Sequence, residues 1–229
     1  MATTRKDVLA NGEIYHVFNR GVERRILFSD KREYQRAIDS INYYRFAEVP
    51  LKLSKYFLRP LPERLSLLEQ LQDKSKKRVS VFSYCLMPNH YHFLIRQEVD
   101  NGISQFISDF SNSLSKYFNT RHSRSGPLLQ GPFKATRVET LEQFLHLSRY
   151  IHLNPVASRL IKPTALFIYP WSSLPEYCGA TQLNICDKEM VLSEFKSVDA
   201  YKKFVSDQVE YALELEKIKH LTIDTEEWA

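Results

Sequence analysis

The sequence is poor in glycine and cysteine and has no long hydrophobic run. Only 6 glycines, beside 43% hydrophobic and 13% aromatic residues, exclude a disordered or low-complexity chain. The three cysteines are odd in number and lack paired metal-ligand spacing, so we expect reduced thiols of a cytosolic protein. No apolar stretch approaches the length of a membrane span, and the first residues lead into no signal-peptide core. The sequence therefore predicts a folded, cytoplasmic protein that enters no membrane.

The length and the charge bound the architecture and the kind of partner. At 229 residues the chain is long enough to bury a sizeable core in one principal domain. We expect this domain to span residues 1–175, with an insertion at about 50–77, and a helical C-terminal extension to follow at 176–229. The 32 Lys and Arg against 27 Asp and Glu give a formal charge of +5, which permits a polyanionic partner without requiring one.

Two histidines, His90 and His92, alternate with Tyr91 and Phe93 in a segment that has the pattern of a β-strand. A strand rises about 3.3 Å per residue and turns successive side chains to opposite faces, so both imidazoles leave one face with their Cα atoms about 6.6 Å apart. Two neutral imidazoles so placed can bind one divalent ion. The alternative for such a pair is a solvated strand surface.

The order of the predicted elements indicates the fold class. Period-two alternation with turn residues predicts strands, and apolar residues at helical spacing predict helices. The order β-α-β-β-α-β is that of an α+β, ferredoxin-like antiparallel sheet with both helices on one face. The two histidines would then point out of the uncovered face. The strands are expected at residues 13–20 and 78–87, around the two histidines, and at 133–138, and the helices after Asp30 and after Asn101.

A further helix is predicted to follow the last strand. Thr140 and Gln143 have the spacing of a capping box at its start. Projected at about 100° per residue, Tyr150 stands off the apolar stripe, and Asn154 lies one turn further on the same face. Pro155 places Asn154 in the last turn. A phenol and an amide oxygen are thus presented together.

Three segments of the sequence together resemble one family. They are Tyr15-His16-Val17-Phe18-Asn19-Arg20-Gly21, Met87-Pro88-Asn89-His90-Tyr91-His92-Phe93-Leu94-Ile95 and Tyr150-Ile151-His152-Leu153-Asn154-Pro155-Val156. In this order they resemble the single-tyrosine transposases with a His-hydrophobic-His motif, and among these the REP-associated tyrosine transposases. The resemblance covers about residues 13 to 175. It departs from the family at Tyr91, where smaller aliphatic residues are commoner, and at the insertion, which has no clear counterpart.

The resemblance implies a metal-dependent endonuclease and strand transferase that forms a 5′-phosphotyrosine intermediate on single-stranded DNA, often next to a hairpin. It implies that His90 and His92 bind Mg²⁺ or Mn²⁺, that Tyr150 is the nucleophile, and that Asn154 is a third ligand or positions the substrate. The general base and the oligomeric state, monomer or homodimer, stay open.

Basic residues near the predicted open face are candidates for DNA binding, with ordinary surface charge as the alternative. We expect His16 and His152 to belong to the core, and His146 to be a surface histidine. The candidates for phosphate contacts are Arg20, Arg24 and Arg25 after the first strand, and Lys134 and Arg137 on the fourth.

Two other functions compete with the transposase. A domesticated protein that holds DNA hairpins without cutting them would bind without metal and form no adduct. A metal hydrolase that activates water would cleave without Tyr150.

Overall fold

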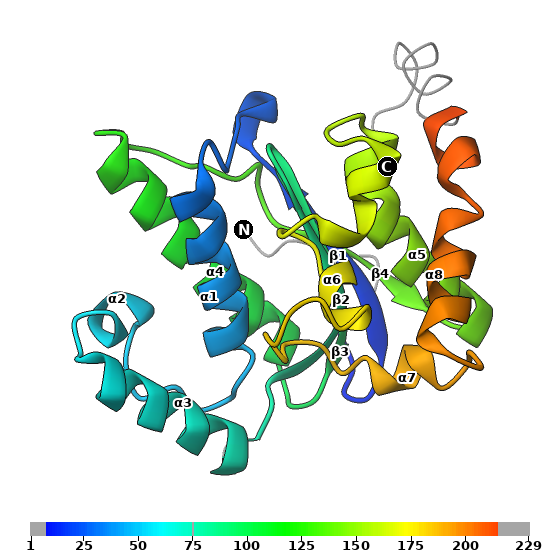
Figure 1. The fold of residues 1–229 in the computed structure, drawn as a ribbon. Helices are drawn as coiled ribbons and strands as arrows, with labels where there is room; N and C mark the ends of the chain where they lie inside the picture. Colours follow the sequence, from blue (N-terminus) through cyan, green and yellow to red (C-terminus); the bar gives the residue numbers. More distant parts are fainter. Residues whose placement is uncertain (1–7, 75, 215–229) are drawn as a thin grey trace.

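The computed structural model describes residues 8–74 and 76–214 (Figure 1). The elements follow the chain in the predicted order, with the additional helices at its end. They are β1 (Ile14–Arg20), the 3-10 helix η1 (Val22–Arg24), α1 (Lys31–Tyr44), α2 (Leu53–Tyr56), α3 (Leu61–Lys74), β2 (Val79–Met87), β3 (His90–Gln97), α4 (Gly102–Arg121), β4 (Lys134–Val138), α5 (Leu141–Ala157), the 3-10 helix η2 (Pro163–Ile168), α6 (Leu174–Tyr177), α7 (Glu189–Leu192) and α8 (Val198–Ser206).

The four strands described form one antiparallel sheet in the order β2-β3-β1-β4. The first and third strands of the chain thus lie side by side in the middle, and β2 and β4 lie at the edges. Together with the β-α-β-β-α-β order of elements, this arrangement confirms the predicted ferredoxin-like fold.

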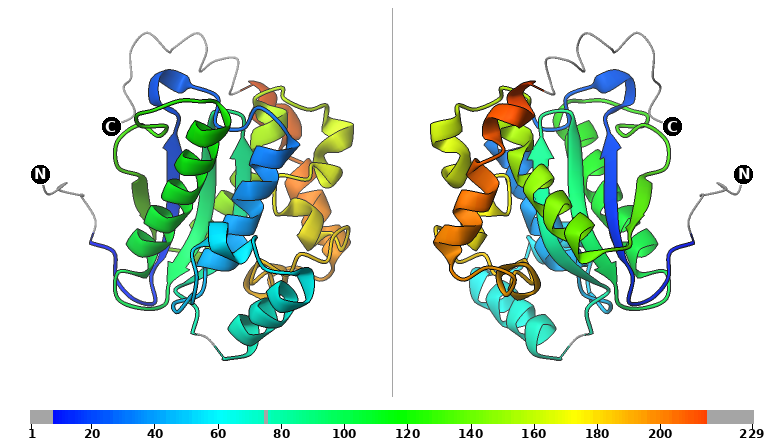
Figure 2. Two further views of the ribbon diagram at one scale, coloured as in Figure 1. Left: turned by 90° about the vertical axis from the view of Figure 1, so that its left-hand side faces the viewer. Right: turned by 90° about the vertical axis from the view of Figure 1, so that its right-hand side faces the viewer.

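Helices cover both faces of the sheet (Figure 2). On one face, α1 and α4 pack against each other and over side chains such as Tyr15, Val17 and Phe93, which are fully buried. On the other face, α5 packs over β2 and β3. The expectation that this second face is uncovered is therefore wrong, because the tyrosine helix folds back over the strand that carries the histidines.

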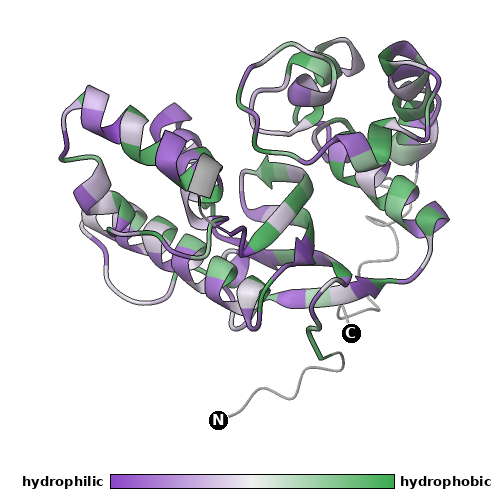
Figure 3. Cartoon of the chain, turned by 90° about the horizontal axis from the view of Figure 1, so that it is seen from below, coloured by the Kyte–Doolittle hydropathy of each residue, from purple (hydrophilic) through white to green (hydrophobic). Residues whose placement is uncertain are grey.

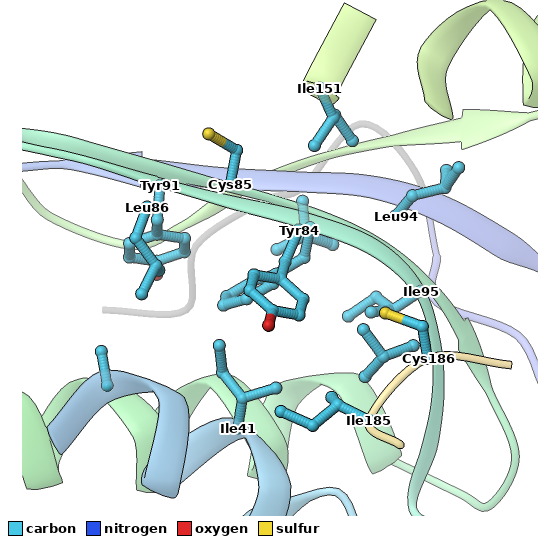
Figure 4. Packing of buried hydrophobic residues seen from close by; sticks show 14 of the residues in the cluster. Ile41, Tyr84, Cys85, Leu86, Tyr91, Leu94, Ile95, Ile151, Ile185 and Cys186 are labelled. Atoms are coloured by element: carbon cyan, nitrogen blue, oxygen red, sulfur yellow. The ribbon is translucent and has the colours of Figure 1, made fainter. Parts of the chain in front are cut away.

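The alternation along β2 and β3 explains why two layers of helices can share one sheet. In Figure 4, Cys85 and Leu94 point toward Ile151 of α5, whereas Tyr84 and Leu86 point to the opposite side, toward Ile41 of α1. Both strands are buried on both faces, as β2 shows along its whole length. Hydrophilic and hydrophobic residues alternate along the helices in Figure 3, as expected for helices with one buried side.

Side chains cap the N-termini of α1 and α5. The Asp30 carboxylate accepts from the backbone N–H groups of Arg32 and Glu33 at the start of α1. Thr140 accepts from the N–H of Gln143 at the start of α5, as the predicted capping box requires. The reciprocal bond is shifted by one residue, because the Gln143 side chain accepts from the N–H of Glu139.

The segment after α5 lies along the outer edge of β2. The N–H of Leu86 donates to the carbonyl of Trp171 at 2.8 Å, that of Ser173 donates to Tyr84 at 3.0 Å, and that of Asp187 donates to Val81 at 2.8 Å. These bonds occupy an edge that would otherwise present unpaired backbone groups.

The boundary at residue 175 stays a prediction, and residues 1–7 and 215–229 of the two predicted domains lie outside the described residues. Tyr177 and Tyr201, from beyond that boundary, are buried in the same hydrophobic cluster as the sheet. The predicted insertion forms α2 and α3, whose Leu53 and Leu71 also reach this cluster. In the described ranges, no helix combines the length and hydropathy needed to cross a membrane.

Candidate active site

His90 and His92 lie on β3 and share the sheet face beneath α5. They pair with Arg20 and Phe18 of the neighbouring strand β1. Their ring planes are nearly perpendicular, at 89°, with 5.1 Å between the centroids. Burial lowers the pKa of His90 to about 4, so this ring is neutral at pH 7 and has a lone pair to offer. The predicted placement of both imidazoles on one face is confirmed.

The turn before β3 orients the first histidine. Nδ1 of His90 lies 2.7 Å from Oδ1 of Asn89. Because an amide oxygen only accepts hydrogen bonds, the proton of His90 is on Nδ1 and the lone pair is on Nε2. The turn itself is held from β1, since the N–H of Gly21 donates to the carbonyl of Asn89 at 2.8 Å.

Helix α5 brings Tyr150 to the histidines. The Tyr150 ring stands edge-on to the His92 ring at 82°, with 5.7 Å between centroids. Its side chain is 36% exposed, whereas that of His92 is 7% exposed, so the phenol lies at the solvent side of the pair. One turn on, the amide nitrogen of Asn154 donates to the Tyr150 carbonyl at 2.9 Å, which leaves the amide oxygen as the atom suited to bind a cation. The structure thus brings Tyr150 to the histidines and ties Asn154 to it.

A buried polar network fixes α5 in this position. His152 contacts the Tyr201 hydroxyl of α8 through Nδ1 at 2.8 Å and the Ser173 hydroxyl through Nε2 at 2.7 Å. Ser148 also contacts the Tyr201 hydroxyl at 2.8 Å. His152 is fully buried, as predicted, and burial lowers its pKa to about 3. Sequence reasoning missed Tyr201 and Ser173, because no local pattern indicates that α8 and the edge of β2 converge on this helix.

His16 is placed differently from its prediction as a core residue. It is half-buried on the sheet face of the candidate site, with Nε2 3.0 Å from Nδ1 of His92. Its ring also lies edge-on to Tyr150, with 6.1 Å between centroids. Alternation along β1 puts His16 on the same face as Phe18, and Phe18 pairs with His92. The sequence could not supply that pairing, because the register between β1 and β3 forms only in the folded sheet. The surface assignment of His146 is confirmed, since its side chain is exposed.

Four of the five predicted DNA-binding residues border this face or its loops. Arg20 is opposite His90 and donates from Nε to the Gln130 side chain at 2.6 Å. Arg24 and Arg25 are exposed at the 3-10 helix η1. Lys134 pairs with Phe18 and therefore projects from the same face as His92.

Arg137 does not border the candidate site. It pairs with Tyr15, whose side chain is buried beneath α1 and α4, so Arg137 projects from the opposite face. There it forms a 2.7 Å ion pair with Glu13. Its predicted position beside the open face is wrong.

The side chains at the site fit a divalent cation. Across the described ranges, no group of three or more His, Cys, Asp or Glu side chains is placed to hold a metal ion. A cation at His90 and His92 would therefore take its next ligand from an amide, water or the substrate, and Asn154 supplies an amide oxygen near Tyr150. Such a mixed nitrogen and oxygen set suits Mn²⁺, and Mg²⁺ when oxygen ligands complete the shell.

Comparison with known proteins agrees with the motifs. Residues 43–154 match the family model described as "Transposase IS200 like", and this segment includes His90, His92, Tyr150 and Asn154. The match covers slightly less than half of the chain and confirms the predicted resemblance. Over this segment the chain is similar to the IS200-like transposases.

One solved structure shares much of the chain's length. Described as a REP-associated tyrosine transposase bound to a REP hairpin, it aligns with 80% of this chain and 90% of that chain, at 15% identity and a TM-score of 0.49. No curated protein matches the sequence significantly.

Proposed function

We propose that this protein is a metal-dependent endonuclease and strand transferase that cuts single-stranded DNA, with Tyr150 as the nucleophile, next to hairpins in repeated sequences. The observation that carries the proposal is the position of the Tyr150 ring against His92, with Asn154 tied to the same helical turn. A protein that only binds hairpins has no need of this combination.

The proposed metal ligands are His90, His92 and Asn154. A bound Mg²⁺ or Mn²⁺ would act as a Lewis acid on the scissile phosphate and orient it. The protein's part is to present neutral imidazoles, and the lowered pKa of His90 and its bond to Asn89 serve that end.

Tyr150 carries the covalent step. A phenol has a reference pKa near 10, so its proton must leave as its oxygen attacks phosphorus. A bond forms between the tyrosine oxygen and phosphorus, the bond to the 3′ oxygen breaks, and that oxygen takes up a proton as the free 3′-hydroxyl. The product is a 5′-phosphotyrosine. Because the phosphodiester energy is kept in the adduct, a second 3′-hydroxyl can reverse the reaction and join strands without ATP.

The single strand is proposed to lie along the rim of the site. Arg20 and Lys134 project from the histidine face, and Arg24 and Arg25 are exposed beside the Asn89 turn. Their guanidinium and ammonium groups can follow the phosphates of an unpaired strand.

An adduct assay tests the proposal. A pool of 3′-labelled single-stranded oligonucleotides, with and without hairpins, is incubated with the protein and Mn²⁺ and separated on a denaturing gel. We expect the label to move to a protein-sized band only with metal, and to be lost in Tyr150→Phe. Tyr211→Phe, a change at a more exposed tyrosine, serves as the matched control and should form the adduct normally.

The outcomes separate the alternatives. An equal band with Tyr150→Phe excludes this tyrosine as the nucleophile. Cleavage that survives in this variant and leaves nothing on the protein indicates a metal hydrolase. Hairpin binding that needs no metal, with no band under any condition, indicates a domesticated binding protein.

A further inference from the structure

We propose that His16 is a positioning residue that accepts a hydrogen bond from Nδ1 of His92 and thereby turns the lone pair of His92 Nε2 toward the metal. This inference deepens the proposed function, because it rests on His92 being a ligand of the cation. It assigns a role to a histidine that lies in the first of the three family segments and that is predicted from the sequence only to pack in the core.

Only one proton can lie between the two nitrogen atoms that join the rings of His16 and His92. Nε2 of His16 and Nδ1 of His92 are 3.0 Å apart, a normal hydrogen-bond length. Each neutral imidazole has one N–H and one lone pair, so one ring donates and the other accepts. If His16 donates, the proton of His92 is on Nε2 and blocks that nitrogen as a ligand. If His92 donates, Nε2 keeps its lone pair, and only this arrangement makes His92 a ligand through Nε2.

The neighbouring ligand is held in the same way. Nδ1 of His90 donates to the Asn89 side chain at 2.7 Å, which leaves Nε2 of His90 for the cation. Both proposed ligands thus have a partner at Nδ1, one an amide and the other an imidazole. Partners that fix the tautomer and orientation of ligating histidines typically change metal affinity 10–100-fold when removed.

The surroundings of His16 keep its ring in place. It lies on β1, which pairs with β3 on one side and β4 on the other, so its backbone is fixed by both neighbours. Its ring plane is nearly parallel to that of His92, at 16° with 5.2 Å between centroids, as expected for two rings joined edge to edge by a hydrogen bond, and the centroid of the Phe18 ring lies 5.0 Å away. A ring held in this way offers Nε2 to His92 in one fixed orientation.

The tautomer of His92 can be measured in the metal-free wild-type protein. Nitrogen-15 NMR of the histidine side chains distinguishes a proton on Nδ1 from one on Nε2. We expect the Nδ1–H form for His92 and for His90. An Nε2–H form of His92 means that His16 is the donor and overturns the inference.

Metal binding by variants gives an independent test, with Mn²⁺ alone as the probe in calorimetric titrations. His16→Phe keeps a flat ring without an acceptor and should bind Mn²⁺ about 10–100-fold more weakly. His16→Gln restores an acceptor oxygen at a similar reach and should recover most of the affinity. Phe18→Leu is the control, because it removes a ring whose centroid lies 5.8 Å from that of His92 but leaves the hydrogen bond between His16 and His92 in place. This variant should bind Mn²⁺ like the wild type.

The possible failures are distinguishable. If His16→Phe binds Mn²⁺ like the wild type, the inference fails whether or not the protein forms a DNA adduct. If the affinity depends on His16 but no adduct forms with any DNA, the proposed function fails and the role of His16 stands. Equal losses in His16→Gln and Phe18→Leu would show that packing around His92 matters, rather than the hydrogen bond, and would also overturn the inference.

Discussion

The Tyr150 ring of α5 stands edge-on to the His92 ring of β3, with 5.7 Å between their centroids. The two residues are far apart in the sequence and meet because α5 packs across β2 and β3. The phenol therefore lies beside the two imidazoles that we propose as metal ligands.

We predict that Mn²⁺ supports adduct formation at lower concentration than Mg²⁺. Two imidazole nitrogens are softer ligands than the oxygens that Mg²⁺ prefers, and Mn²⁺ accepts both. Rates measured over a range of each metal, after chelation with EDTA, give the two half-activating concentrations. Equal or reversed values would argue against two imidazoles in the metal site.

His152 is predicted to make the protein less stable in mild acid. Its pKa is about 3 in the folded protein, against a reference of 6.5. Below pH 6.5 the unfolded chain therefore binds a proton that the folded chain does not, and stability falls as the pH drops toward 3. The loss attributable to this group is up to about 1.4 kcal/mol per pH unit.

Comparison with His152→Gln isolates this contribution. The variant lacks the titrating group, and at pH 7.5 it should be less stable than the wild type by about 1–3 kcal/mol, because partners of the buried imidazole lose a hydrogen bond. Since the wild type alone loses stability through this group in acid, the difference should shrink between pH 6.5 and 5. Urea unfolding at several pH values measures it. A difference that stays constant over this range would contradict a neutral, buried His152.

Lys134 and Arg137 should differ in their effect on DNA binding. Lys134 projects from the histidine face, whereas Arg137 projects from the opposite face and pairs with Glu13. Lys134→Ala should weaken single-strand binding and reduce the dependence of log K on log salt by about 0.7, the value for one phosphate contact. Arg137→Ala is the matched control and should leave both quantities unchanged. Fluorescence anisotropy at several salt concentrations measures them, and equal effects would place the strand elsewhere.

Gly21→Ala should disturb the loop beside the histidine turn. A Cβ at this position would lie 2.1 Å from the carbonyl oxygen of Arg25, so the backbone must shift. The N–H of Gly21 also donates to Asn89, which orients His90. We expect a loss of about 1–3 kcal/mol of stability and a lower adduct rate.

The backbone origin of this effect has its own control. Arg25→Ala removes the side chain but keeps the carbonyl that a Cβ at residue 21 would meet. It should affect DNA affinity without the loss of stability. If Gly21→Ala is as stable as the wild type, the loop accommodates the methyl group and the prediction is wrong.

The periodicity of the sequence alone was enough to predict which side chains share a face of a strand or a helix. Alternation with a period of two put His90 and His92 on one face, and helical spacing put Tyr150 and Asn154 on one side of α5. The same rule puts Lys134 and Arg137, three residues apart on one strand, on opposite faces. This alternation does not show which of the two side chains shares a sheet face with His90 and His92.

Only the tertiary structure decided the pairings that make the site. The register of β1 against β3 brings His16 to His92, and the register of β4 against β1 turns Arg137 away. The packing of α5 over the second sheet face, held by Tyr201 from α8, covers a surface expected to be open. These contacts join segments distant along the chain. Their geometry depends on strand register and on burial of whole faces, which no short stretch of sequence specifies.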